Sequence, residues 1–303
     1  MKTFLIKVLT ILLIILAADR AFSLVVKALF KTTTTTDEYK LNAVTYQMNA
    51  PVIFMGSSRC HHHYVPSIIQ DTLKTPVYNA GLWGLRNIYF QYGLLCNILE
   101  RYTPKTICLE VHPIDYLATP FSQTAITGSL TPYINISPGC DEVLKVAGLY
   151  YKSEIFELYR YNSQFANIVA GNLSTRTLAS DKGFKPLYGK LDTTFKITPE
   201  RFPFAADSAK IHYLQAFIDK CKEKHIQLIF LFSPFYAVEK NHIVDIPDSI
   251  ARKNHIPFIN HYNLAGFTGH PEVYYDFGHL NETGAKKYSA VIASELKRYI
   301  KNQ

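Results

Sequence analysis

The sequence predicts an α/β protein whose parallel sheet is covered by helices on both faces and preceded by a membrane helix. Short apolar runs that end in turns alternate with stretches of helical spacing, as in parallel strands joined by crossover helices. Five such runs fit a three-layer, flavodoxin-like sheet. Sites in sheets of this kind gather at the carboxyl ends of the strands, so functional residues are expected in the loops that follow them.

Size and composition narrow the class of protein. The chain has 303 residues, of which 48% are hydrophobic, which is ample for a packed core and too much for a disordered chain. The formal charge is +8, but no dense basic block or nucleic-acid motif is present, so we expect no nucleic-acid partner. The scattered Cys60, Cys96, Cys108, Cys140 and Cys221 form no paired motif. We therefore expect no disulfide framework, no metal site and no cofactor.

The N-terminal segment is predicted to be a membrane helix. Residues 8–18 form an apolar run, Asp19-Arg20 interrupts it, and residues 21–30 are again apolar. The first run alone has the length of a signal-peptide core, whereas residues 4–30 together are long enough to span a bilayer. No convincing cleavage site follows the first run. We therefore favour an uncleaved signal anchor over residues 1–31, with a cleaved signal peptide or a buried amphipathic helix as alternatives.

The charges beside this helix predict its orientation. Lys2 and Lys7 favour a cytoplasmic N-terminus, although Lys27 and Lys31 at the other end weaken that argument. The chain would then be a single-pass protein of the cell membrane whose main domain lies on the extracytoplasmic (periplasmic) side. Residues 32–50 read as a polar spacer, and residues 51–303 as the globular domain.

The expected elements of the domain follow in order. Apolar runs ending in turns predict strands at residues 51–55, 76–79, 106–111, 227–232 and 256–259. Helical spacing predicts helices at residues 65–74, 85–102, 208–224, 248–254 and 284–301. Residues from about 116 to 204 break the alternation, with one helix expected at 153–170. We interpret this segment as an insertion that forms a cap or partner surface over the site.

Three short motifs carry the chemistry. Gly56-Ser57-Ser58 follows the first strand, where a serine hydroxyl would lie at the sheet edge beside amides able to stabilise an oxyanion. Asn79 to Gly84 follows the second strand, and its glycines permit an exposed N–H. Asp276 to His279 precedes the last helix, where the carboxylate can orient the imidazole that takes the serine proton. Each motif alone could be an ordinary turn or a helix cap.

Together the motifs resemble the SGNH/GDSL hydrolase superfamily, over residues 51–301 apart from the insertion. Gly56 to Ser58 is similar to that family's first block, Asn79 to Gly84 to its second, and Asp276 to His279 to its last. The resemblance implies a three-layer fold of the SGNH type. It also implies a catalytic triad of Ser58, His279 and Asp276, with the Ser58 and Gly84 amides as oxyanion donors. Cys60 is the less favoured alternative nucleophile.

The membrane helix and the Gly-Ser-Ser form of the first block are most similar to one branch of the superfamily. This branch contains the D-alanyl transfer protein of teichoic acid synthesis and polysaccharide O-acetylation proteins. The resemblance implies an esterase or O-acyltransferase acting on an acylated envelope glycan or a lipid-linked substrate. It also implies a membrane acyltransferase as a partner.

The chain departs from the family at the third strand, whose end normally supplies an asparagine to the oxyanion hole. Here the strand ends Glu110-Val111-His112. Either His112 or another donor replaces the asparagine, or the hole relies on the Ser58 and Gly84 amides. The departure supports an alternative function, a non-catalytic scaffold or glycan-binding partner of a membrane acyltransferase.

Several residues near the motifs are candidates for substrate binding. Arg59 either orients an anionic substrate or forms an ion pair. Of His61, His62 and His63, one or two are expected to line the cleft and the others to be solvated. Asn79 and His112 are further candidates. Trp83 and Tyr64 either stack on a sugar or pack in the protein.

Overall fold

The structure, a computed structural model, describes residues 1–33, 37–119, 127–162, 164–173, 181–194, 205–238 and 243–300. Its centre is a five-stranded parallel sheet with the strand order β2-β1-β3-β4-β5. The strands are β1 (Val52–Met55), β2 (Val77–Asn79), β3 (Thr106–Glu110), β4 (Gln227–Phe232) and β5 (Phe258–Asn260). All five lie within one residue or two of the predicted runs, and the predicted α/β fold with helices on both faces is confirmed.

The register brings the carboxyl ends of neighbouring strands to one edge of the sheet. Phe54 of β1 pairs with Asn79 on one side and Cys108 on the other, and Glu110 of β3 pairs with Leu231 of β4. The loops that follow β1, β2, β3 and β4 therefore start side by side. Every residue of β1 and β3 is buried, which explains why these strands are continuous apolar runs without alternation.

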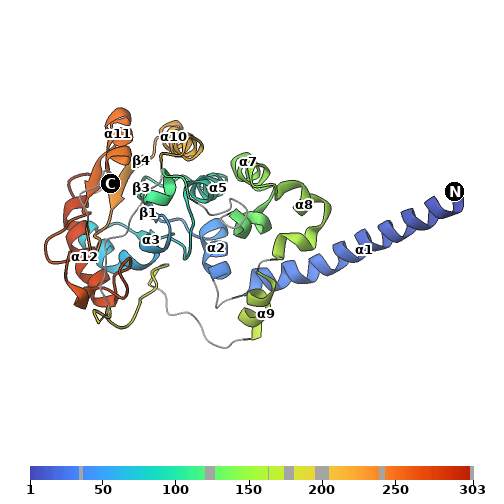
Figure 1. The fold of residues 1–303 in the computed structure, drawn as a ribbon, viewed down its shortest axis with the longest axis horizontal. Helices are drawn as coiled ribbons and strands as arrows, with labels where there is room; N and C mark the ends of the chain where they lie inside the picture. Colours follow the sequence, from blue (N-terminus) through green and yellow to red (C-terminus); the bar gives the residue numbers. More distant parts are fainter. Residues whose placement is uncertain are drawn as a thin grey trace.

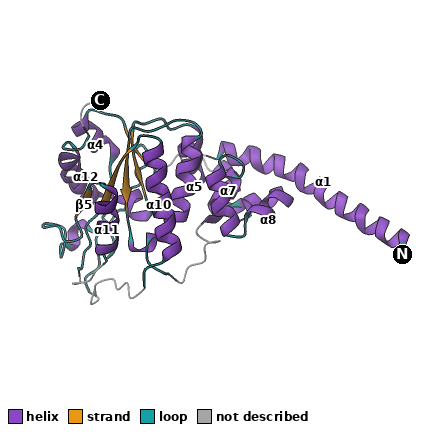
Figure 2. Cartoon of the chain, turned by 90° about the horizontal axis from the view of Figure 1, so that it is seen from above, coloured by secondary structure: helices purple, strands orange, loops and turns teal. Residues whose placement is uncertain are grey.

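Helices cover both faces of the sheet (Figures 1 and 2). Successive strand residues point to opposite faces, so Ile53 and Phe54 belong to different core clusters. The Phe54 side is covered by α3 (Ser58–His63), α4 (Pro66–Leu73) and α12 (Glu282–Leu296). The Ile53 side is covered by α5 (Ile88–Leu99), α10 (Ser208–Glu223) and α11 (Asp245–Asn254).

Side-chain caps set helix starts that periodicity alone misplaces. The Asn87 side chain accepts the Tyr89 amide, so α5 begins at Ile88 and not at residue 85. The Asn281 side chain accepts the Gly284 amide, so α12 begins two residues before the predicted start. The Asp207 side chain accepts the amides of Ala209 and Lys210, so α10 begins at Ser208.

Two segments differ from their predicted form. The single helix expected at residues 153–170 is instead α8 (Tyr150–Ile155), the 3-10 helix η3 (Glu157–Tyr161) and α9 (Phe165–Leu173). Residues 37–46, inside the predicted spacer, form α2 (Asp37–Tyr46). Leu41 and Val44 of α2 are buried in the core, so burial of this face outweighs the polar composition of the segment.

The described parts of the insertion lie beside α5 and beside the N-terminal helix. They comprise η2 (Gly128–Tyr133), α7 (Pro138–Val146), α8, η3 and α9. Helix α7 packs on α5, and η3 and α9 pack on the N-terminal helix α1 (Lys2–Thr32). A further described stretch, residues 181–194, places Phe184 and Leu191 in the core cluster of α12.

Helix α1 has two different halves. Its first half projects from the globular part with its apolar side chains exposed (Figure 1). In its second half Asp19, Ser23, Val26 and Phe30 are buried against the domain. Among the described helices α1 is long and apolar enough to cross a bilayer, which fits either a membrane anchor or a signal sequence.

Candidate active site

Four segments of the chain, three that follow β1, β2 and β3 and one that precedes α12, meet in a cavity of about 230 Å³ at the carboxyl edge of the sheet. Its lining consists of Ser57, Ser58, Arg59, Gly84, Leu85, His112, Ile114, Asp276, Phe277, Gly278 and His279. Gly56, between β1 and α3, has φ +150°, and a Cβ there would lie 2.9 Å from Cys60 Cβ and 3.0 Å from Glu110 Cβ. Only glycine allows this close approach, which lets the chain turn from β1 directly into α3.

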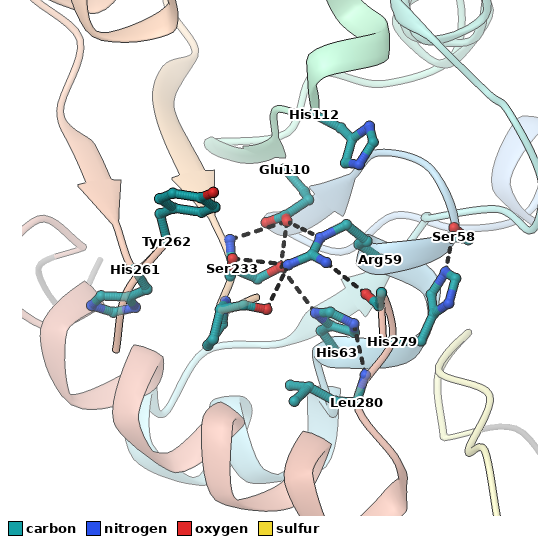
Figure 3. Close-up of polar contacts among 12 residues, drawn as sticks. Ser58, Arg59, His63, Glu110, His112, Ser233, His261, Tyr262, His279 and Leu280 are labelled. Atoms are coloured by element: carbon teal, nitrogen blue, oxygen red, sulfur yellow. Dashed lines mark hydrogen bonds and ion pairs between the residues drawn. The ribbon is translucent and has the colours of Figure 1, made fainter. Parts of the chain in front are cut away.

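The structure brings together the three residues predicted as a triad. His279 Nε2 lies 2.8 Å from Ser58 Oγ, and His279 Nδ1 lies 2.9 and 3.0 Å from the two oxygens of Asp276. Figure 3 shows the Ser58–His279 contact at the start of α3. The three side chains form one hydrogen-bonded row, although Ser58 and His279 are 221 residues apart.

The Asp276 carboxylate is held ionised by its surroundings. Partial burial raises the pKa of Asp276, but the hydrogen bond and charge of His279 and the amides of Gly278 and His279 outweigh it, so the net pKa is below the usual value. Oδ1 of Asp276 accepts the Gly278 and His279 amides at 2.8 and 2.7 Å. The carboxylate is therefore fixed in place and can orient the imidazole through Nδ1–H.

The predicted oxyanion donors lie beside this row. Gly84 lines the cavity with φ +86°, and a Cβ built there meets nothing within 4 Å, so the chain at this point borders open space. Ser58 is the first residue of α3, where amides have no acceptor inside the helix. Both backbone segments line the same cavity, where a pair of oxyanion donors would be needed.

Behind Ser58 and His279 lies a buried polar network that the sequence did not reveal (Figure 3). The Leu280 amide donates to His63 Nε2 at 3.0 Å, and His63 Nδ1 lies 2.9 Å from Ser233 Oγ. Since Nε2 accepts, Nδ1 carries the proton and donates to Ser233. The Ser233 hydroxyl in turn donates to Glu110 Oε1. Burial, and then the charge of Arg59, lower the pKa of His63, which keeps the ring neutral.

Arg59 joins this network to the loop that carries His279. It forms a buried ion pair with Glu110, with 3.4 Å from Nε to Oε1, and stacks on the Phe235 ring at 3.9 Å. Its two terminal nitrogens donate to the carbonyls of Gly278, Ser233 and Pro234 at 2.6–2.8 Å. These contacts favour the ion-pair alternative for Arg59 over direct substrate contact, although Arg59 also borders the cavity.

Glu110 and Ser233 could have been found by one sequence signal. Each is a polar residue at the carboxyl end of an apolar strand run, next to the predicted site edge. Burial raises the pKa of Glu110, and Arg59 and the hydroxyl of Ser233 oppose that shift. The buried Glu110 carboxylate is therefore tolerated only because Arg59 and Ser233 pair with it.

The three adjacent histidines are all buried, so the prediction that some are solvated is wrong. His61, His62 and His63 are at most 2% exposed, and none of them lines the cavity. Helix α3 packs between the sheet and α12, which leaves no solvent face. His61 Nδ1 lies 2.8 Å from the Gly81 carbonyl, and His62 Nδ1 donates to the Lys185 carbonyl at 2.7 Å.

The other candidates divide between scaffold and cavity. Asn79 is fully buried, donates to the Cys60 and Tyr64 carbonyls at 2.7 and 2.8 Å, and accepts the Gly81 amide, so it ties β2 to α3. Tyr64 is buried and donates to Glu110. Asn79 does not line the cavity, so its predicted role in substrate binding has no support from the structure.

His112 and Trp83 remain at the site itself. His112 lines the cavity, and its Nδ1 accepts the Ile114 amide at 3.4 Å, which places the proton on Nε2. Burial, and then the charges of Arg59 and His279, lower its pKa and keep the ring neutral. Trp83 is 46% exposed and its ring stacks on His279 at 5.8 Å.

Cys60 is a poor candidate for a nucleophile. Its side chain is fully buried, and burial raises the pKa of the thiol well above its usual value. The thiol contacts Asn79 Oδ1 at 3.7 Å and points away from the cavity lining. Within the described residues, no group of three His, Cys, Asp or Glu side chains is placed to hold a metal ion.

Comparisons with known proteins give only distant similarities. No protein-family model matches the sequence, and no match is found among curated proteins. Among solved structures, the chain is similar to a protein described as lipolytic, of the G-D-S-L family, from Desulfitobacterium hafniense (9% identity, TM-score 0.41, 80% of this chain and 98% of the other). It is also similar to the acetyl xylan esterase AlAXEase (14% identity, TM-score 0.41, 82% and 98%). These likenesses are too distant to establish a family, and the functional argument rests on the site.

Proposed function

We propose that this chain is a serine-dependent esterase or O-acyltransferase of the SGNH kind, acting on an acylated envelope glycan or lipid-linked substrate. The observation that carries the proposal is the hydrogen-bonded row of Ser58, His279 and Asp276 beside Gly84 in one cavity. An imidazole between a hydroxyl and a carboxylate is the arrangement that activates a serine.

The reaction proceeds by two acyl transfers. Ser58 Oγ attacks the ester carbonyl while His279 Nε2 takes its proton, and the Ser58 and Gly84 amides hold the oxyanion. The tetrahedral intermediate collapses, the alcohol leaves with the proton from His279, and the acyl group stays on Ser58. Water or a glycan hydroxyl then gives its proton to His279 and attacks the acyl-enzyme. The second tetrahedral intermediate collapses, the bond from Ser58 Oγ to the acyl carbon breaks, and His279 returns its proton to Oγ as the acid or the new ester leaves.

His112 supports the proposal at the point where the chain departs from the family. It lies two residues after β3, where the third block would supply an asparagine, and it borders the cavity with its Nε2 protonated. A neutral imidazole N–H is a hydrogen-bond donor of the type an oxyanion hole uses. We assign His112 the role of the third donor.

The cavity favours a small acyl group. Its volume of about 230 Å³ is below the range of roughly 300–1,000 Å³ typical of pockets that enclose whole ligands. The alcohol part of the substrate would therefore lie outside it. Trp83 and Phe277, 46% and 54% exposed, lie beside His279 and offer apolar ring faces on which a sugar can stack.

The apolar half of α1 supports the proposed location. As an uncleaved anchor it would keep the domain at the membrane surface, on the extracytoplasmic side that Lys2 and Lys7 favour. There it would meet lipid-linked or envelope substrates and a membrane acyltransferase as donor or partner.

Ester hydrolysis by the purified full chain tests the function. We expect release of p-nitrophenol from p-nitrophenyl acetate, and transfer of acetyl to an oligosaccharide acceptor if the chain is a transferase. Ser58→Ala should lower both by about 10³-fold or more. Ser208→Ala, an exposed serine at the start of α10, is the matched control. Equal rates for Ser58→Ala and the wild type would overturn the proposal.

A non-catalytic scaffold or glycan-binding role is the second candidate, because β3 ends without the expected asparagine. Envelope acylation in cells that carry Ser58→Ala distinguishes the two. A scaffold keeps acylation at the wild-type level, whereas the enzyme loses it.

A further inference from the structure

The buried side of α1 shows how the helix meets the domain. Asp19, Ser23, Val26 and Phe30 lie three or four residues apart and form one stripe that faces the protein. The Phe30 ring packs on Tyr133 and Tyr161 at 5.7 and 5.4 Å. The lower half of α1 is therefore part of the domain's packing and not a flexible tether.

The opposite side of the same turns stays apolar and exposed. Phe22, Leu24 and Val25 are 63%, 67% and 58% exposed, although they lie beyond Asp19. Water would not favour three such side chains on one short helical stretch, whereas lipid would.

The length of α1 indicates where the bilayer must end. A bilayer core is about 30 Å thick, and residues 5–18 of a helix rise only about 20 Å. Residues 5–25 rise about 30 Å, and the exposed Lys27 then marks one boundary. Lys2 marks the other boundary, together with Lys7, whose long side chain can reach the headgroups from the first turn of the span. The span is long enough only if it includes Phe22, Leu24 and Val25, and this places Asp19 at membrane depth.

Asp19 is shielded from lipid by one segment of the domain. Its two oxygens accept the amides of Glu157 and Leu158 at 2.7 and 3.1 Å, and Arg20 donates to the Glu154 carbonyl at 3.1 Å. Ser23 donates to Glu157 Oε2 at 2.7 Å. These contacts fix α8 and the start of η3 at the level of residues 19–23 of α1, and satisfy polar groups that lipid could not.

The same segment carries an exposed apolar group. Tyr151, Ile155 and Phe156 are 68%, 54% and 44% exposed. Both ribbon views show α8 at the edge from which the first half of α1 projects (Figures 1 and 2). Ile155 and Phe156 lie between Glu154 and Glu157, which bond Arg20 and Asp19, so they are beside the helix in the last turns of its span.

We propose a lipid-facing surface that sits in the interfacial layer of the bilayer. It consists of α8, Phe156 and the exposed side chains of α1 from Phe22 to Val25. Aromatic and aliphatic side chains with a nearby lysine, here Lys152, suit the boundary between headgroups and acyl chains. The inference rests on the proposed membrane anchor and adds a second contact that fixes the domain's orientation and height above the membrane.

A fluorescent probe tests the surface in the full chain. The native cysteines are all buried, so Ile155→Cys and Phe156→Cys can each be labelled selectively with an environment-sensitive dye. Tyr188→Cys, at a side chain 69% exposed on the stretch that packs near α12, is the matched control. Each labelled chain is reconstituted into vesicles of phosphatidylethanolamine and phosphatidylglycerol.

Quenching by headgroup- and acyl-linked nitroxide lipids should be at least several-fold stronger for the probes at 155 and 156 than at 188. Quenching by aqueous iodide should follow the opposite order. One contrary result is a labelled chain that floats with the vesicles while iodide quenches the probes at 155 and 156 as strongly as the control. That result would overturn this inference alone. A chain that does not float would overturn the anchor as well. Neither result depends on esterase activity.

Discussion

Replacing Arg59 by methionine tests whether the buried network positions the proposed triad. The guanidinium holds the Gly278 carbonyl at 2.6 Å, one residue before His279, and pairs with Glu110. Methionine is unbranched and apolar and can still pack on Phe235, but it removes every donor. The substitution therefore changes both the charge balance and the hold on the His279 loop.

The substitution should lower both the stability of the fold and the reactivity of Ser58. Glu110 is 1% exposed, and leaving a buried charge without its partner costs about 3–5 kcal/mol of folding free energy. Losing the contact with Gly278 frees the His279 loop, and a misplacement of about 1 Å at a reacting group costs about 10²-fold in rate.

Urea unfolding and the rate of fluorophosphonate labelling measure the two effects independently. The double variant Arg59→Met/Glu110→Gln leaves no charge buried, so it should recover part of the stability but remain about 10²-fold slower to label. Arg252→Met is the matched control, because that side chain is 79% exposed in its ion pair with Asp248 and should cost at most about 1 kcal/mol.

Two results would refute the reasoning. One is a loss of stability in Arg59→Met no larger than in Arg252→Met. The other is a double variant that labels as fast as the wild type, because the network would then have no part in positioning His279.

Three further predictions follow from the same site. Asp276→Asn should keep the far-ultraviolet circular dichroism but slow fluorophosphonate labelling by about 10⁴-fold, since it disturbs the His279 tautomer; labelling at the wild-type rate would contradict this. Gly84→Ala should cost about 1 kcal/mol in urea unfolding because of its φ of +86°, and slow labelling at least tenfold by displacing the amide; an unchanged rate would exclude that amide as a donor. Burial lowers the pKa of His62 to about 3, and the hydrogen bond to the Lys185 carbonyl partly opposes this shift. Between pH 6.5 and 3 the unfolded chain therefore binds a proton on this ring that the folded chain does not. Stability should therefore fall by about 2 kcal/mol for this ring as the pH drops from 7 to 5, and His62→Gln should lose less; equal stability of the wild type at both pH values would contradict the assignment.

The sheet could be predicted because its signals are local. The apolar run at residues 227–232 and the glycine turn after β1 are each encoded within a few neighbouring residues, and β4 has the predicted bounds. The order of the motifs along a parallel sheet then placed Ser58, Gly84 and His279 at one edge. Their hydrogen-bond distances required coordinates.

The features that escaped prediction depend on tertiary contacts. The sequence predicts that one or two of the three histidines of α3 line the cleft and the others are solvated, but all three are buried and α12 packs on α3. For Arg59 the sequence left substrate contact and an ion pair as alternatives, and only the distant Glu110 and the Gly278 carbonyl identify its partners inside the protein. The lower half of α1 likewise joins the domain through residues 154–158, a link with no signal in either segment alone.

Mass spectrometry of the fluorophosphonate-treated full chain tests the central claim most directly. The account predicts one adduct, on the peptide that contains Ser58, and no adduct in Ser58→Ala at the same probe concentration, while Ser208→Ala labels normally. An adduct on another residue in the wild type, or undiminished labelling of Ser58→Ala, would contradict it.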